Sequence, residues 1–230
     1  LGESIIDLQR RGNNVEVIGV SRTWITRNAI MCAGLQSDRL ARMTEPELPL
    51  KILPFRGEYY KLNPSAQSMV KHLIYPVPDP SFPFLGVHFT RMIDGNVECG
   101  PNAVFAFGRE AYRVADFNLY DSWDAITWPG FRKVVKKHWR NGLEEYHRSF
   151  SKAAFVKSLQ RLMPEIQAEH LEVCGAGIRA QACDRDGTLL DDFVFRHDRN
   201  IVHVCNAPSP AATASLSIGQ TIANKIINQL

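Results

Sequence analysis

The sequence predicts a mixed fold: a partial α/β portion built from both ends of the chain, joined to an antiparallel sheet with a helical cluster (α+β). Three observations predict it. Short strand-like runs separated by turn residues open the chain, and hairpin patterns around Asp94-Gly95 and Asp186-Gly187 flank a helical stretch. A buried strand and then a helical pattern close it. With 230 residues, the chain can bury a substantial core.

The opening elements lead into a glycine turn. The runs IIDLQ, VEVIGV, TWIT and NAIMCAG have the residue types of short strands, and LQSDRLARM has a helical pattern. The apolar run that ends at Cys32 stops at Ala33-Gly34, just before this helix. Glycine permits unusual dihedral angles and close approach of a ligand to the backbone. A ligand contact around Leu35 and a simple tight turn are equally compatible with these residues.

The middle of the chain alternates as antiparallel strands do. LPFRGEYYKL, GVHFTRM and NVECG show this alternation, and GAGIRAQACDRDGTLLDDFVF repeats the hairpin pattern. Helical patterns cover roughly Ser122 to His147, interrupted at Pro129-Gly130, and Lys152 to Met163, which Pro164 ends. These patterns predict a sheet with a helical cluster.

The closing segment predicts a strand, a tight loop and a helix. NIVHVCNA is typical of a buried strand, and IGQTIANKIINQL places apolar residues four apart. Ser209 can cap the helix and Pro210 can occupy its first turn. The small residues from Ala207 to Thr213 would let a flat anionic group reach the N–H groups of a helix start. A capped terminal helix without a ligand is the alternative.

Composition excludes several classes. No apolar run approaches the ~18 residues that a membrane-spanning helix needs. The net charge of +3 is small and no concentrated basic face is evident, so we expect no nucleic-acid partner. The densest basic run, FRKVVKKHWR from Phe131 to Arg140, is typical of the solvated face of a half-buried helix. No CxxC or histidine-pair spacing occurs, so we expect no metal site.

Five runs together resemble a known family. They are CAGLQSDRL, PFRGEYYKL, HLIYPVPDPSFPFLGVHFTRMIDGNVECGPNAVFAF, GAGIRAQACDRDGTLLDDFVF and NAPSPAAT. In this order they resemble the FAD-dependent L-2-hydroxyglutarate dehydrogenases and oxidases, within the D-amino-acid oxidase and sarcosine oxidase superfamily. The resemblance covers essentially the whole chain.

The resemblance implies the C-terminal part of an FAD-binding Rossmann-like flavoprotein with an antiparallel-sheet substrate domain. Residues 1–48 would be part of the FAD-binding domain, 49–198 the substrate domain, and 199–230 a return to the first. Members of the family hold the FAD pyrophosphate with an opening GxGxxG turn, which does not occur here. We therefore expect the chain alone to bind FAD poorly and to be inactive.

The reaction implied is oxidation of L-2-hydroxyglutarate to 2-oxoglutarate: the C2 hydrogen leaves as hydride to flavin N5, and a base takes the hydroxyl proton. The helix start near the PSPAAT loop would stabilise negative charge on the reduced flavin. The resemblance assigns to the cofactor Ala33, Gly34, Leu35, Gly177, Ala207, Pro208, Ser209, Pro210, Ala211 and Ala212.

Four residues are candidates for the substrate. Arg179 occupies the place where related oxidases carry an arginine that grips the substrate carboxylate, although Ala180 stands where they often have proline. Tyr75 matches a substrate-facing tyrosine of the same relatives, and Arg56 is a further carboxylate contact. His88 is the candidate catalytic residue. Each residue also has an alternative role without a ligand. Arg179 could form a surface ion pair, and Tyr75 could belong to the core. His88 could be a structural histidine, and Arg56 could pair with Glu58.

Other readings of the function remain open at this stage. The chain could belong to an amino-acid or secondary-amine oxidase of the same superfamily, or form a non-catalytic module. The implied partners are a dicarboxylate substrate and oxygen or a quinone as electron acceptor, and peripheral membrane association is left open. The implied location is the bacterial cytoplasm, or the mitochondrion in a eukaryote.

Overall fold

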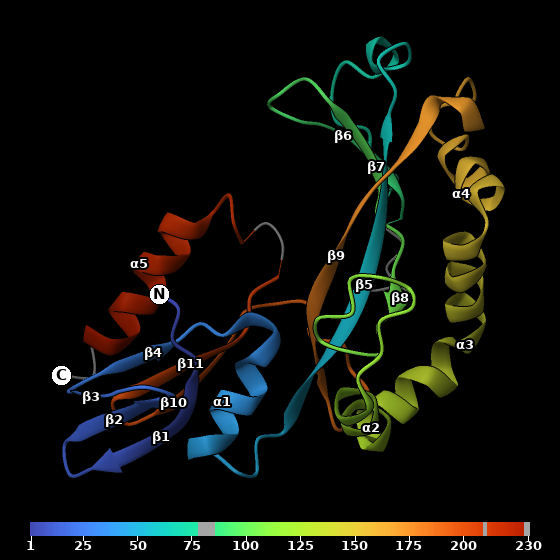
Figure 1. Cartoon of the computed structure of the whole chain (residues 1–230). Coiled ribbons are helices and arrows are strands. Elements are labelled where there is room, and N and C mark those ends of the chain that lie inside the picture. The colour runs from blue at the N-terminus through green and yellow to red at the C-terminus, as the bar shows by residue number, and fades with distance from the viewer. Residues whose placement is uncertain (78–85, 209–210, 228–230) are drawn as a thin grey trace. The chain divides into compact units, whose positions relative to one another are not determined.

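The computed structural model describes residues 1–77, 86–208 and 211–227 (Figure 1). The chain divides into two compact units, which are described separately. The first joins Leu1–Leu53 to Ala180–Leu230, and the second is Pro54–Arg179. Residues 180–198, which the sequence patterns group with the substrate domain, thus fall in the first unit, since the strand at 194–198 pairs with the strand at 201–206.

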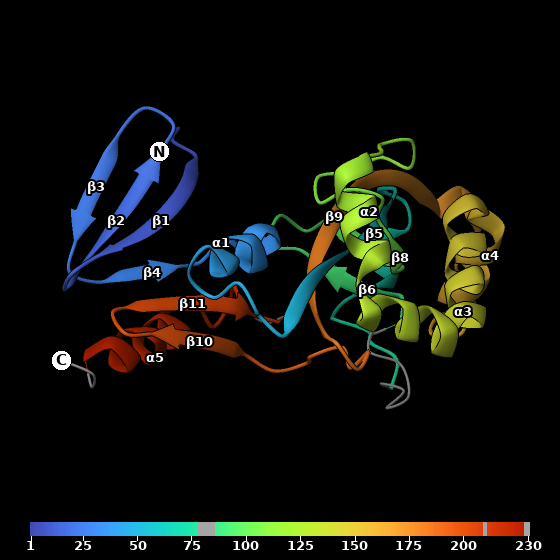
Figure 2. The ribbon, with the colours of Figure 1, turned by 90° about the horizontal axis from the view of Figure 1, so that it is seen from below.

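The first unit contains two small sheets. Its elements are β1 (Ile5–Arg11), β2 (Asn14–Gly19), β3 (Thr23–Thr26), β4 (Ala29–Met31), the short 3-10 helix η1 (Gly34–Gln36), α1 (Ser37–Thr44), β10 (Val194–Asp198), β11 (Ile201–Asn206) and α5 (Ser215–Ile227). The strands β1, β2 and β3 form an antiparallel meander, as their patterns predict. A second sheet has the order β10-β11-β4 (Figure 2).

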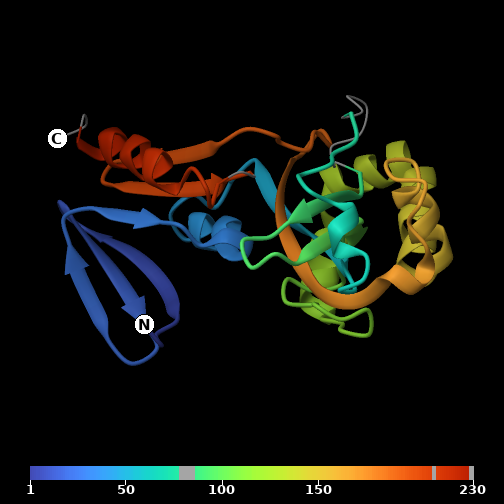
Figure 3. The same cartoon turned by 90° about the horizontal axis from the view of Figure 1, so that it is seen from above.

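Strand β11 is the centre of the first unit, and all of its residues are buried. Val202 and Val204 pack with Ile222 of α5, which lies along β10 and β11 (Figure 3). On the alternate positions, Ile201 packs against Val15 of β2. A strand covered on both faces gains apolar burial along its whole length, which explains why IVHVC is continuously apolar apart from one histidine.

The second unit is a five-stranded sheet with helices. Its elements are β5 (Leu50–Leu62), the 3-10 helix η2 (Gln67–Met69), β6 (His88–Arg91), β7 (Val97–Gly100), β8 (Val104–Phe105), α2 (Leu119–Thr127), α3 (Pro129–Phe150), α4 (Lys152–Leu159), the 3-10 helix η3 (Ala168–His170) and β9 (Leu171–Asp184). The order is β6-β7-β5-β8, and β9 also pairs with β5. Both β5 and β9 extend across the boundary between the units.

The core of the second unit lies between its sheet and α4. Phe155 and Leu159 of α4 pack with Phe89 and Cys99 of the sheet. The break at Pro129 separates α2 from α3 as the sequence predicts, and α3 has a further kink at His138 (φ −119°, ψ 17°). Among the described residues, no helix combines the length and apolarity needed to cross a membrane.

Candidate substrate pocket and flavin edge

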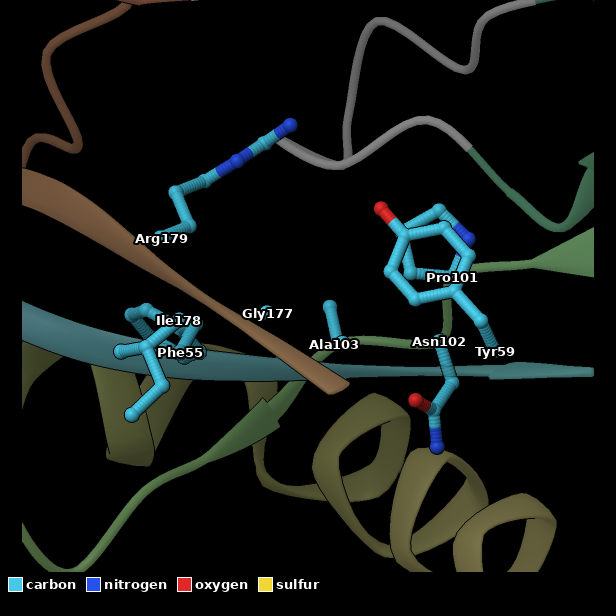
Figure 4. A pocket seen from close by; sticks show the side chains of 9 residues that line it. Phe55, Tyr59, Pro101, Asn102, Ala103, Gly177, Ile178 and Arg179 are labelled. Carbon is cyan, nitrogen blue, oxygen red and sulfur yellow. The ribbon is translucent and has the colours of Figure 1, made fainter. Parts of the chain in front are cut away.

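A pocket of about 200 Å³ lies on the second unit, beside strands β5 and β9 (Figure 4). Its lining residues come from these two strands and from the turn after β7. They are Phe55, Gly57, Tyr59, Pro101, Asn102, Ala103, Gly177, Ile178 and Arg179. Arg179 is the cation of this set, and the Arg179 and Tyr59 side chains rise from the same side of the strands.

Side-chain alternation along β5 decides which of its residues reach the pocket. Phe55, Gly57 and Tyr59 are two apart, so they share one face of the strand. Arg56 and Glu58 take the opposite face, where the Ser149 hydroxyl of α3 donates a 2.8 Å hydrogen bond to Glu58. One strand thus supplies the pocket on one side and a polar contact with the helices on the other.

Glycine at position 57 allows the turn after β7 to approach the β5 backbone. A Cβ added to Gly57 would lie 2.5 Å from the Pro101 Cβ and 3.1 Å from the Asn102 carbonyl oxygen. Asn102 holds the turn in place, because its side-chain oxygen accepts from the Glu58 N–H at 2.7 Å and its amide donates to the Glu58 carboxylate at 3.0 Å. The shape of the pocket therefore depends on this glycine.

Arg179 and Tyr59 supply hydrogen-bond donors at the pocket. Burial lowers the pKa of Arg179 from its ordinary value, and the Tyr59 charge raises it; the ordinary value is so high that the guanidinium stays charged at neutral pH. Burial is the largest cause that raises the pKa of Tyr59, and the charge of Glu98 raises it further, whereas the charge of Arg179 lowers it. Because the net effect raises this pKa, the phenol keeps its proton at neutral pH. A guanidinium and a phenol that both donate suit a carboxylate.

His88 and Tyr75 lie together on the same unit. Their ring centroids are 4.5 Å apart and their planes meet at 32°. The His88 Nδ1 lies 3.0 Å from the Gly86 carbonyl oxygen, which can only accept, so Nδ1 carries the proton and Nε2 of the neutral ring is left as the acceptor. Burial lowers the pKa of His88, the Gly86 bond raises it, and the Arg179 charge lowers it. His88 is thus a neutral base at neutral pH.

Arg56 does not line the pocket. Its side chain is buried, with 3% of the residue exposed. The guanidinium pairs with Glu58 at 3.1 Å and donates to the Arg113 carbonyl at 3.1 Å. This is the ion pair that the sequence offered as the alternative, and the alternation of β5 is its physical cause. Sequence analysis missed Tyr59, although the same alternation places it two residues from Gly57.

Two glycine- or alanine-rich loops meet at one edge of the first unit. Strands β4 and β11 are parallel, with Ala29 opposite Ile201 and Met31 opposite His203. Their carboxyl ends therefore lie at the same edge, where ligands bind in open α/β sheets. The loop after β4 carries Gly34 at φ +52°, with nothing within 4 Å of an added Cβ.

The turn after β4 is tied to β11. The Ser37 hydroxyl, which follows η1, donates to the Cys205 carbonyl at 3.1 Å. Ala33, Gly34 and Leu35 therefore lie near the end of β11 and the beginning of the loop at Ala207. Among the described residues, Ala33, Gly34 and Leu35 thus lie near the start of a loop that is more than 170 positions away in the numbering.

The terminal helix begins later than the sequence suggests. Helix α5 starts at Ser215, after a turn over residues 211–214, and the proposed cap Ser209 and first-turn Pro210 lie outside the described residues. The Ala211 N–H donates to the Pro208 carbonyl at 3.1 Å, so this amide is used inside the loop. The positive end of the α5 dipole is thus at residues 215–217, beyond Ala212, because residues 211–214 form a turn before the helix begins.

Gly177, the remaining cofactor candidate, lies in the second unit. It is an exposed residue of β9, and an added Cβ would find nothing within 4 Å. It also lines the pocket, two residues from Arg179 and therefore on the same side of the strand.

Two solved oxidase structures share this fold. L-alpha-glycerophosphate oxidase from Mycoplasma pneumoniae, solved with FAD bound, matches 99% of this chain and 50% of its own with a TM-score of 0.66 at 17% identity. Glycine oxidase from Bacillus cereus matches 99% of this chain and 50% of its own with a TM-score of 0.57 at 14% identity. The fold is therefore shared with about half of each of these two oxidases.

The sequence itself defines the family. The model of the FAD dependent oxidoreductase (DAO) family matches residues 1–225, and the chain belongs to this family. L-2-hydroxyglutarate dehydrogenase of Indibacter alkaliphilus is 54% identical over 96% of this chain and 56% of its own length. The enzyme of the same name from Escherichia coli K12 is 48% identical, and the match covers 86% of this chain and 47% of that enzyme. The mitochondrial L-2-hydroxyglutarate dehydrogenase of Nematostella vectensis is 49% identical, and the match covers 86% of this chain and 45% of that enzyme. The chain spans about half the length of these relatives.

Proposed function

We propose that this chain supplies the substrate-binding half of an FAD-dependent enzyme that oxidises L-2-hydroxyglutarate to 2-oxoglutarate. The observation that carries the proposal is the pocket in which Arg179 and Tyr59 both present donors, within a chain about half identical to enzymes named for this substrate. A carboxylate that accepts from a guanidinium and a phenol is held in one orientation.

The chain's own residues account for binding and proton transfer. Arg179 and Tyr59 hold the carboxylate next to the reacting carbon. The neutral His88, which is outside the set of lining residues, accepts the hydroxyl proton at Nε2. Bound FAD supplies the acceptor for the hydride that leaves C2. Within the pocket, Arg179 is the single cation among the described lining residues, so the second carboxylate of the substrate is held by groups outside this set.

The first unit fits a flavin at its parallel edge. Gly34 leaves open space at a left-handed backbone position, and the loop from Ala207 to Ala212 consists of small residues where it is described. A flat ring can approach the backbone closely at such residues. The first turn of α5 directs N–H groups toward the same loop and favours negative charge there. The proposed electron acceptor is oxygen or a quinone, in the bacterial cytoplasm or the mitochondrion.

Anaerobic reduction of the flavin tests the function. The full-length, FAD-loaded protein that contains this chain is mixed with L-2-hydroxyglutarate, its D-enantiomer, glycine or sarcosine, and the flavin absorbance is followed. We expect the absorbance to be lost with L-2-hydroxyglutarate and 2-oxoglutarate to appear in equal amount, because one hydride carries the two electrons that reduce one flavin. A separate binding titration of the chain with L-2-hydroxyglutarate measures the affinity of the pocket for the substrate, and this affinity does not depend on reduction of the flavin.

Two results would contradict the proposal. Loss of absorbance with glycine or sarcosine, and not with L-2-hydroxyglutarate, would assign the chain to an amine oxidase of the same family. A protein that takes up FAD and binds none of these compounds would be a non-catalytic module.

A further inference from the structure

The turn after β7, residues 101–103, forms one side of the pocket that Arg179 and Tyr59 also line. The turn approaches the β5 backbone closely at Gly57, and at its start a Cβ added to Gly100 would lie 3.3 Å from the Tyr59 Cδ1. The room that the pocket leaves beside its two donors therefore depends on where this turn lies.

Glu58 holds this turn from the face of β5 that points away from the pocket. The Asn102 side chain is buried and is directed away from Arg179, toward α3 (Figure 4). Its amide donates to one carboxylate oxygen of Glu58 at 3.0 Å. The other oxygen accepts from Arg56 at 3.1 Å and from Ser149 at 2.8 Å. Donors thus occupy both oxygens, and a carboxylate is the side chain of this size that accepts at both.

A second carboxylate holds the next residue of the turn. Glu145 of α3 is buried, with 7% of the residue exposed. Its Oε2 accepts from the Ala103 N–H at 3.2 Å, and its Oε1 pairs with Arg148. Asn102 and Ala103 are therefore both held by acceptors on the helical side of the sheet.

We propose that Glu58 is a positioning residue for the substrate, because it fixes the turn that forms one side of the pocket. This inference rests on the proposed function, since it concerns the same pocket. Glu58 is not among the described lining residues, so it acts through Asn102 and does not touch the substrate. A carboxylate that binds Arg179 and Tyr59 together needs the space beside both donors to be constant.

The isosteric variant Glu58→Gln tests this role in the full-length, FAD-loaded protein. Its amide oxygen can still accept from Arg56 and Ser149. Its amide nitrogen would face the Asn102 amide, and two donors cannot bond to each other. We expect KM for L-2-hydroxyglutarate to rise about tenfold, because a small displacement of a positioning group weakens productive binding.

The comparison of KM with kcat distinguishes positioning from loss of folded protein. His88 is outside the lining residues, and its pairing with Gly100 on β7 does not involve Glu58. The value of kcat per bound flavin should therefore change less than KM does. Unfolded protein does not contribute to a rate expressed in this way.

A compensating substitution tests the path through Asn102. In Glu58→Gln/Asn102→Asp the carboxylate and the amide exchange positions, so the amide at position 58 can donate to the carboxylate at position 102. The charge of the pair is unchanged. We expect KM to return to within about threefold of the parent value, because the two sites are directly coupled. A KM that stays as high as in Glu58→Gln would overturn the proposed path.

The Ala103 contact gives an independent pair of variants. Glu145→Leu removes the acceptor for the Ala103 N–H and should also raise KM, whereas Glu145→Gln keeps an acceptor there and should not. If Glu58→Gln does not fold, this pair decides whether the position of the turn sets KM. Equal KM in both Glu145 variants would then overturn the proposal.

The matched control is Glu172→Gln. Glu172 is an exposed glutamate of β9 that pairs with Lys61 at 3.2 Å, so the variant removes the same charge from an ion-paired strand residue of the same sheet. It should leave KM unchanged. An equal rise in Glu172→Gln and Glu58→Gln would show a general effect of charge and overturn the assignment to Glu58.

The results separate this proposal from the proposed function. If the parent oxidises L-2-hydroxyglutarate and Glu58→Gln has the same KM, the positioning role is wrong and the function stands. If glycine or sarcosine reduces the parent instead, the proposed function is wrong. The same comparison of KM with that compound then decides the role of Glu58, because both compounds carry a carboxylate. A parent that none of these compounds reduces would overturn both proposals.

Discussion

Arg179 is the residue on which the pocket's chemistry depends most. The sequence singled it out by resemblance, and the structure places it at a pocket beside Tyr59, which sequence analysis did not select. Its role in carboxylate binding remains a proposal. A guanidinium can form two parallel hydrogen bonds with a carboxylate, and an ammonium group cannot reproduce that geometry.

Replacing Arg179 by lysine tests this role. We expect Arg179→Lys to raise KM for L-2-hydroxyglutarate by about tenfold or more, since a hydrogen bond to a charged group contributes about 1.5–3 kcal/mol. Steady-state kinetics of the full-length, FAD-loaded protein would measure the change in KM. Arg185→Lys, in the hairpin turn at the end of the same strand, is the control and should leave KM unchanged. An unchanged KM in Arg179→Lys would indicate a structural arginine.

His88 is expected to be the proton acceptor. His88→Gln should lower kcat by about 10²–10⁴-fold, the usual contribution of a general base. Because burial lowers the His88 pKa, the parent enzyme should keep its base neutral down to pH values below about 6.5, and kcat should fall only under more acidic conditions. The pH profile measures this. His72→Gln, at an exposed position of the same unit, is the control for loss of an imidazole. Equal kcat in His88→Gln and the parent would refute the role.

At the scale of single elements, β5 shows what alternation contributes. The sequence predicts this strand, but it does not say which of its faces meets the pocket. In the structure β5 pairs with β7, β8 and β9, and Phe55, Gly57 and Tyr59 line the pocket. Arg56 then faces the helices and pairs with Glu58. The residue types around Arg56 and Tyr59 do not by themselves show which of the two side chains faces the pocket.

Gly57→Ala tests the packing of β5 against the turn after β7. The new methyl group would lie 2.5 Å from the Pro101 Cβ, so the turn must move, and we expect a loss of about 1–3 kcal/mol in the free energy of unfolding. Urea denaturation would measure it. Gly142→Ala in α3 is the control: nothing lies within 4 Å of its added Cβ, and the helix should gain up to about 1 kcal/mol. Equal stability of Gly57→Ala and the parent would contradict the close packing.

For the whole molecule, three histidines that are buried or half-buried link stability to pH. Burial is the largest cause of a lowered pKa at His88, His138 and His203. The unfolded chain then binds protons at a higher pH than the folded chain does. Above the pKa of histidine in the unfolded chain, about 6.5, the neutral rings make their full contribution to the free energy of unfolding. This contribution is lost as the pH falls below that value toward the lower pKa values of the folded chain.

Urea denaturation at several pH values between about 7.5 and about 5.5 would measure this dependence. We expect the free energy of unfolding to decrease as the pH is lowered. His203→Gln should make the dependence shallower. In the parent, His203 is buried, with its Nε2 2.8 Å from the Thr44 hydroxyl and its Nδ1 without a hydrogen-bond partner in the described part of the chain. The exposed His197→Gln controls for loss of an imidazole. An unchanged slope in His203→Gln would exclude His203 as a contributor.

The sequence by itself determined the local elements and the family. Turn residues at Asp94-Gly95 and the break at Pro129 mark boundaries that the structure confirms, because these residues act through their own backbone. The five family-like runs indicated the FAD-dependent family that the comparisons establish. These features need no knowledge of distant contacts.

Only the tertiary structure decided which residues share a site. The parallel pairing of β4 with β11 joins positions 29 and 201, and β5 with β9 joins Tyr59 to Arg179 at one pocket. Pairing between strands so far apart depends on loop closure and on which faces become buried, and neither leaves a local pattern.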